Sequence, residues 1–171
     1  MYDAVLAGCT WLEGTPWGVM VRDSTWMYPV MKWVHFVGLS MWLGTSLIVD
    51  LRLIGVGERR QTAAELSHGL FAWSWIGFFV AFVGGFLLFS VEATTYVSNT
   101  GFRLKLAVLI PLALMWHVVV HKKARAWTQT GHTSAIGKWA GLIELLLWIS
   151  VVTASVGFLL TNAVTSPLST P

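Results

Sequence analysis

An apolar stretch with two histidines constrains the fold more than any other part of the chain. Residues 102–125 read FRLKLAVLIPLALMWHVVVHKKAR, and sixteen uncharged residues separate Lys105 from Lys122. At about 1.5 Å per residue, a helix of this stretch with its flanking side chains approaches the roughly 30 Å thickness of a bilayer's hydrocarbon core. His117 and His121 are four residues apart and therefore share one helix face. The stretch predicts a membrane span with two ionisable side chains near its basic end.

The composition predicts an integral membrane protein. Of the 171 residues, 56% are hydrophobic and only 11% are charged, which leaves little room for a soluble domain. The net charge of +3 is explained by basic residues that flank the spans, because no basic stripe alternates with aromatic residues. We expect a lipid bilayer, and no nucleic acid, as the partner.

Three further apolar stretches predict three more spans, at about 27–54, 63–91 and 139–161. The fold class we expect is all-α, an integral membrane four-helix bundle. Before the first span, Gly14, Pro16 and Gly18 interrupt any long helix, and tryptophans mix with charged residues. The predicted organisation is an interfacial N-terminal segment over 1–26, a four-span membrane domain over 27–162 and a C-terminal tail over 163–171.

The basic residues predict the orientation of the spans. Seven lie in the loops after the first and third spans, namely Arg52, Arg59, Arg60, Lys122, Lys123, Arg125 and Lys138. Four lie on the other side, namely Arg22, Lys32, Arg103 and Lys105. Because cytoplasmic loops carry the excess of Lys and Arg, both termini are expected outside.

Ionisable residues from all four spans are predicted at one depth. With the middle of each uncharged run as the bilayer centre, five of them fall roughly 5 to 16 Å to the inner side. These are Asp50, His68, His117, His121 and Glu144. A carboxylate inside a span costs a few kcal/mol unless it is protonated, paired or hydrated. We therefore expect Glu144 to contact His117 or His121, as a group that orients a histidine or transfers a proton.

Such a layer has the parts of a b-type haem site. Two imidazoles from different helices can bind haem iron, and basic residues can pair with the propionates. The best-matched depths are those of His68 and His121, with His117 as the alternative ligand, and Arg52 and Arg59 are the propionate candidates. Small residues at 77, 81 and 85 repeat every four positions; this spacing favours close helix packing and could also admit a flat cofactor.

His35 lies apart from the other histidines, roughly 9 Å to the outer side of the bilayer centre. It could be an axial ligand, a donor to a bound molecule, or a histidine that hydrogen-bonds to a neighbouring helix. Met27, Met31 and His35 recur at four-residue spacing, and sulfur and imidazole ligands suit Cu(I). Without porphyrin, the inner histidines and Glu144 could equally bind an ion. Metal handling is therefore the rival interpretation, with His35, His68, His117 and His121 as metal ligands.

The motifs KWVHFVGLSMWLG, DLRLIG and GFRLKL within residues 30–125 resemble those of small bacterial membrane proteins related to four-helix b-type cytochromes and the copper-resistance D family. The resemblance implies a four-helix fold in the bacterial inner membrane and haem b or copper as the bound species. It also implies electron transfer with quinone or a partner protein, and it indicates His35 and His117 as functional histidines. Two-haem members carry histidine pairs on both sides, whereas the outer layer here has His35 alone.

These observations together predict a membrane haem b protein that transfers electrons, on its own or as the cytochrome b component of an oxidoreductase with other membrane or periplasmic redox subunits. Copper binding or transport is one alternative. A non-catalytic anchor subunit of a respiratory complex is the other.

Overall fold

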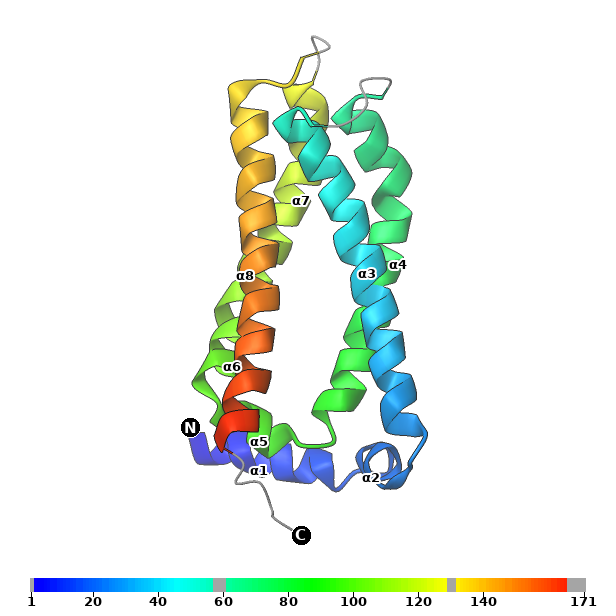
Figure 1. The fold of residues 1–171 in the computed structure, drawn as a ribbon, viewed down its shortest axis with the longest axis vertical. Coiled ribbons are helices and arrows are strands. Elements are labelled where there is room, and N and C mark those ends of the chain that lie inside the picture. The colour runs from blue at the N-terminus through cyan, green and yellow to red at the C-terminus, as the bar shows by residue number, and fades with distance from the viewer. Residues whose placement is uncertain (1, 57–60, 129–131, 166–171) are drawn as a thin grey trace.

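The regular structure of the chain is helical throughout the part described by a computed structural model, namely residues 2–56, 61–128 and 132–165, with side chains up to residue 156. Four helical segments are long and apolar enough to cross a membrane, as predicted. They are α3 (Met27–Ile54), α4 (Ala63–Phe89), the continuous stretch Thr100–Trp127, and α8 (Ala135–Thr165). Figure 1 shows them running side by side along the long axis of the molecule.

The first two predicted spans begin and end where local signals place them. Helix α3 ends at Gly55, whose φ of 102° lies in the left-handed region that glycine adopts without strain. Helix α4 starts after Thr62, whose side chain accepts from the Glu65 amide while the Glu65 carboxylate accepts from the Thr62 amide. This reciprocal capping satisfies two amides that the helix itself leaves without partners.

The third span is built from three consecutive helical segments. These are α6 (Thr100–Leu104), the π-helical turn η1 (Lys105–Leu109) and α7 (Ile110–Trp127). Pro111 has no amide proton and its ring clashes with the carbonyl four residues earlier, which accounts for the wider turn just before it. The connection between α4 and α6 also contains a short helix, α5 (Ala93–Ser98).

The C-terminal boundary differs from the prediction. Helix α8 continues to Thr165, so residues 163–165 of the predicted tail are helical. No glycine or proline stands between residue 161 and Thr165, the next being Pro167, so a helix already formed can extend through these residues. The rest of the predicted tail, 166–171, lies outside the described residues.

The N-terminal segment forms two helices that lie across one end of the molecule (Figure 1). Helix α1 (Tyr2–Glu13) and helix α2 (Pro16–Asp23) are separated at Gly14, with Thr15 as the N-cap and Pro16 at the first position of α2. Helix α1 packs on α5, where Cys9 and Leu12 join a small buried cluster. The Glu13 carboxylate accepts from both the amide and the hydroxyl of Thr94 at 2.7 Å, which fixes α1 to the start of α5.

Helices α3 and α4 pack closely because glycines meet backbone at their crossing. A Cβ at Gly38 would overlap the backbone of Ala81, and a Cβ at Gly77 would lie 2.6 Å from the Trp42 amide nitrogen. A Cβ at Gly85 would lie 2.9 Å from the imidazole of His35. The small-residue repeat of α4 therefore serves helix packing against α3, the interpretation that its spacing favours.

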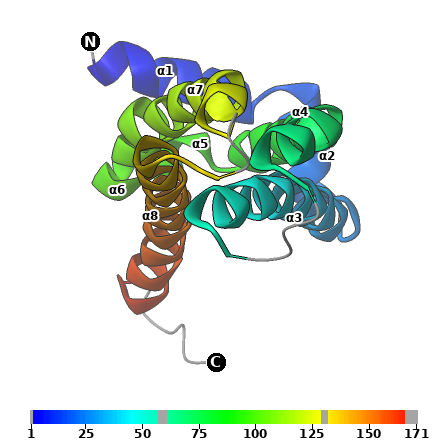
Figure 2. The same ribbon diagram turned by 90° about the horizontal axis from the view of Figure 1, so that it is seen from above.

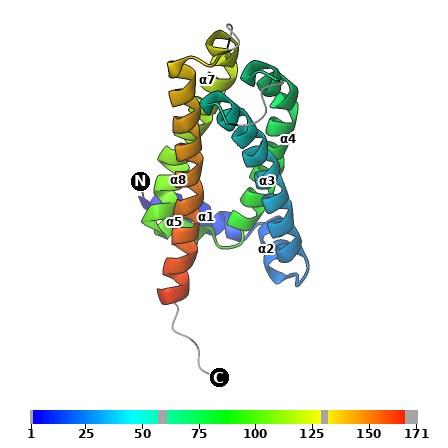
Figure 3. The same cartoon turned by 45° about the horizontal axis from the view of Figure 1, so that its top comes forward.

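The long helices converge at one end and separate toward the other (Figures 1 and 3). We call the end with the connections α3–α4 and α7–α8 the loop end, and the end with α1, α2 and α5 the terminal end. The buried core at the loop end includes Val49, Leu53, Ala63, Val120 and Ala140. Seen from above, α8 lies between α3 and the α6–α7 segment (Figure 2). The polar residues of the predicted inner layer lie in this converged half.

Candidate functional site

A buried hydrogen bond between α7 and α8 is the centre of the site. The Nδ1 atom of His117 lies 2.5 Å from Oε1 of Glu144, and both side chains are 1% exposed or less. Trp148 donates its indole N–H to the same carboxylate oxygen at 3.5 Å. The ring of Trp42 covers His117, with a centroid separation of 4.6 Å. The contact predicted from the depth of Glu144 is therefore present.

Asp50 of α3 extends this pair to a third helix. The backbone of Asp50 packs against α8 one turn before Glu144, where a Cβ at Gly141 would lie 3.0 Å from the Asp50 carbonyl oxygen, and only 1% of Asp50 is exposed. Neither Asp50 oxygen has a hydrogen-bond donor among the described groups, and the same holds for Oε2 of Glu144. In the sequence Asp50 stands next to Arg52 at the end of a span, which is typical of a residue facing water. The approach of α8 buries it instead.

Two serines of α4 complete the contacts of the α7 histidines. Ser67 Oγ lies 2.6 Å from His121 Nδ1, and Ser74 Oγ lies 3.4 Å from His117 Nε2. The two imidazole rings are 4.3 Å apart between centroids. Both serines were missed as site residues in the sequence. Their seven-residue spacing places them on one face of an otherwise apolar helix, and this signal could have identified them.

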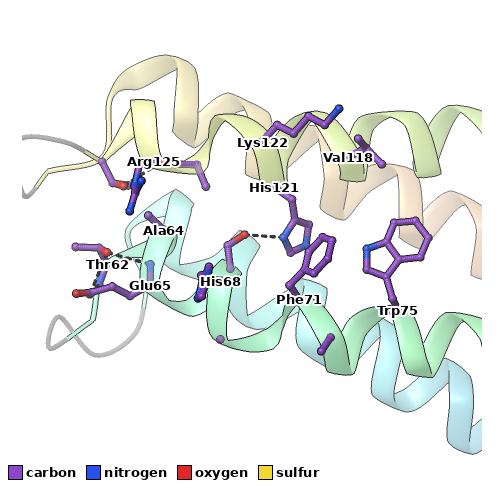
Figure 4. A pocket seen from close by; sticks show the side chains of 15 residues that line it. Thr62, Ala64, Glu65, His68, Phe71, Trp75, Val118, His121, Lys122 and Arg125 are labelled. Carbon is purple, nitrogen blue, oxygen red and sulfur yellow. Dashed lines mark hydrogen bonds between the residues drawn. The ribbon is translucent and has the colours of Figure 1, made fainter.

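A groove between α4 and α7 opens beside these contacts. It has a volume of about 1170 Å³, and Figure 4 shows His121 reaching into it from α7. Its walls include two imidazoles, two aromatic rings and two cationic side chains: His68, His121, Phe71, Trp75, Lys122 and Arg125. The groove therefore combines an apolar surface with nitrogen ligands and positive charge near the loop end.

The predicted pair His68 and His121 thus lines one groove, but the two histidines have different environments. His121 is partly buried and held by Ser67, whereas His68 is exposed and lies on the next position of α4. Arg52 is not part of the groove lining. Its guanidinium donates to the carbonyl of Gln61 at 2.6 Å, which ties the end of α3 to the start of α4. Arg59, the other propionate candidate, lies outside the described residues.

His35 lies away from this layer, in the half where the helices separate. Its Nδ1–H donates to the Ala81 carbonyl at 2.6 Å. In the π-helical turn, the ammonium of Lys105 donates to Ser155 at 3.2 Å. The hydrogen bond to a neighbouring helix, one of the three roles expected for His35, is present.

The chemistry available to the buried layer is proton binding and hydrogen bonding. A carboxylate that accepts from an imidazole N–H fixes the tautomer and orientation of that ring. Within the described ranges, no three histidine, cysteine or carboxylate side chains are arranged to hold a metal ion. The proposed porphyrin-free site of inner histidines and Glu144 therefore lacks a converged ligand set. A haem needs only two axial side chains, so it does not require such a group of three.

Comparison with known proteins adds no family assignment: no protein-family model, no curated protein and no solved structure matches this chain.

Proposed function

We propose that this chain is a membrane haem b protein that transfers electrons, and that the groove between α4 and α7 binds the haem. The observation that carries the proposal is that imidazoles from two different helices, His68 and His121, line one groove. Bound haem would supply one-electron transfer, with quinone or a redox partner protein as the source or acceptor of electrons.

The lining of the groove fits a haem in three respects. Its volume of about 1170 Å³ is above the roughly 300–1,000 Å³ of common ligand pockets and is therefore large enough for a cofactor. Phe71 and Trp75 supply apolar walls, and Lys122 and Arg125 are cations suited to propionates. The Ser67 contact occupies Nδ1 of His121 and leaves Nε2 for a ligand, the usual arrangement for a ligating histidine.

We assign His117 a different role from His121. Both of its ring nitrogens have partners, Glu144 on one side and Ser74 on the other, and the side chain is fully buried. A ring held in this way is suited to hydrogen bonding rather than to iron ligation. In this proposal His117 and Glu144 position the α7 helix and its second histidine.

We further propose that the four apolar helices form a bundle in the bacterial inner membrane, with both termini outside. Large apolar side chains cover the outer faces of the helices, including Trp33, Trp73, Phe82 and Trp139, which are 57 to 72% exposed. Exposed apolar surface on this scale favours lipid contact over water. The excess of basic residues near the loop end supports its placement on the cytoplasmic side.

The test is an optical spectrum of the chain purified in detergent after expression with haem supplementation. We expect a reduced minus oxidised difference typical of a low-spin b-type haem. Removing one imidazole leaves the iron five-coordinate or water-bound, so His121→Ala and His68→Ala should each give a high-spin spectrum or lose the haem. The matched control is His132→Ala, because His132 is an exposed histidine in the α7–α8 connection.

Two outcomes would overturn this assignment. If His35→Ala and His117→Ala abolish the haem signal while His68→Ala and His121→Ala retain it, the ligands are those indicated by the family resemblance. If the preparation is colourless and contains stoichiometric copper by elemental analysis, the copper alternative replaces haem. Met27, Met31 and His35 are then the first ligands to substitute.

A further inference from the structure

We propose that Asp50 and Glu144 form a proton-binding site in which one proton is held between the two carboxyl groups. This inference does not depend on what the groove binds. It concerns the buried side of the layer, where α3 meets α8, rather than the α4–α7 groove.

Both carboxyl groups are buried where α3 packs against α8. Asp50 and Glu144 are each 1% exposed and lie on segments with the length and hydropathy of membrane spans, and a Cβ at Gly141, one turn before Glu144, would lie 3.0 Å from the Asp50 carbonyl oxygen. Two ionised carboxylates buried at this crossing would combine a desolvation cost with mutual repulsion. The pair is therefore expected to carry one negative charge rather than two.

Three buried carboxyl oxygens of the pair lack hydrogen-bond donors. Both oxygens of Asp50 and Oε2 of Glu144 are buried and have no hydrogen-bond partner among the described groups. Ionised carboxylates only accept hydrogen bonds, so two of them cannot satisfy each other. A single proton on Asp50 turns its carboxyl into a donor toward Oε2 of Glu144. That proton supplies a partner for an oxygen of each residue.

The groups around the pair determine what can neutralise its charge. From α7, His117 donates its Nδ1–H to Oε1 of Glu144, and the ring of His121 lies beyond it. From α4, the neutral hydroxyl of Ser74 contacts the other nitrogen of His117. On α3, Arg52 is directed to the Gln61 carbonyl. Among the contacts of the described residues, no Lys or Arg reaches the pair, so a proton is the neutralising species that these groups favour.

The ionisation state follows from this arrangement. Glu144 is the ionised member, because it already accepts from His117 and Trp148. Asp50 is the protonated member, because no N–H group reaches it. In this layer the carboxylic acid of Asp50 on α3 donates to the carboxylate of Glu144 on α8, which also accepts from the imidazole of His117 on α7.

Infrared spectroscopy of the purified full-length chain tests the proposal. At neutral pH we expect the C=O stretching band of a protonated carboxyl group, and we expect it to shift to lower frequency in D2O. Asp50→Asn should abolish the band. Glu144→Gln should shift it, because the acceptor of the Asp50 proton changes from a carboxylate to an amide. Glu92→Gln is the matched control and should leave it unchanged, because Glu92 is exposed.

The spectrum of the wild type alone can overturn the proposal, so the test does not require the variants to fold. Absence of a protonated carboxyl band from the wild type at neutral pH would refute a shared proton. If the band is absent and Na⁺ raises the unfolding temperature of the wild type but not of Asp50→Asn, the site binds a metal cation instead. Haem propionates are also carboxyl groups, so loss of the band in Asp50→Asn assigns it to this pair whether or not the chain binds haem.

Discussion

The Glu144 carboxylate accepts a hydrogen bond from His117 at 2.5 Å, and this contact joins α8 to α7 in the interior of the molecule. Neither side chain reaches solvent. Each residue is therefore the other's main compensation for lost hydration, because an unpaired polar group in such a place is costly. The stability of the converged half of the fold should depend on this pair.

Glu144→Leu is expected to lower the free energy of unfolding by about 1–3 kcal/mol, because it leaves the His117 N–H buried without an acceptor. Glu144→Gln should cost less, since its amide oxygen can still accept. The measurement is unfolding in detergent mixtures followed by circular dichroism. Glu92→Gln serves as the control and should stay within about 0.5 kcal/mol of the wild type. Equal stability of Glu144→Leu and Glu144→Gln would show that the hydrogen bond contributes nothing.

Gly38 and Gly44 provide a matched pair on α3. Gly38→Ala places a methyl group against the backbone of Ala81, and we expect a loss of about 1–3 kcal/mol as α3 and α4 move apart. The methyl group added by Gly44→Ala would have no atom within 4 Å. The higher helix propensity of alanine should therefore leave the free energy of unfolding unchanged or raise it by up to about 1 kcal/mol. The same unfolding experiment measures both. Similar losses in the two variants would contradict the described α3–α4 contact.

Cys9 reports on the docking of α1 against α5. Burial, and to a lesser extent the neighbouring Glu13 carboxylate, raise the pKa of the Cys9 thiol. Less thiolate is then present at neutral pH, and the thiolate is the reactive species. We expect maleimide to label native Cys9 at least about tenfold more slowly than a Thr10→Cys thiol in a Cys9→Ser background, with the Cys9 rate still rising above the ordinary thiol pKa. Thr10 is the exposed neighbour on the same helix. Equal rates would mean that α1 is not docked.

The orientation in the membrane is tested with reporters fused after Pro171. The distribution of basic residues predicts an exported C-terminus, so a reporter active only in the periplasm should be active. A second fusion, inserted in the α3–α4 connection, should be active only with a cytoplasmic reporter. The reverse pattern would exchange the inner and outer sides of the molecule.

The sequence alone predicted where the helices lie and the level of each polar residue along them. Hydropathy predicted spans over about 27–54 and 63–91, and in the structure Gly55 and Thr62 cap α3 and α4 at those boundaries. A fixed rise per residue was enough to bring Glu144 to the level of His117. These properties depend on local interactions along one chain segment, which a sequence contains in full.

The tertiary structure decided which way each helix faces. Depth does not distinguish Ser67, which contacts His121, from His68 beside it, which is exposed. Nor does it reveal that Asp50 is buried where α3 packs against α8. The rotation of a helix about its axis and the identity of its neighbours are set by side-chain packing between distant segments, such as Gly38 on Ala81. One sequence read in isolation contains the residues of these contacts but not their pairing.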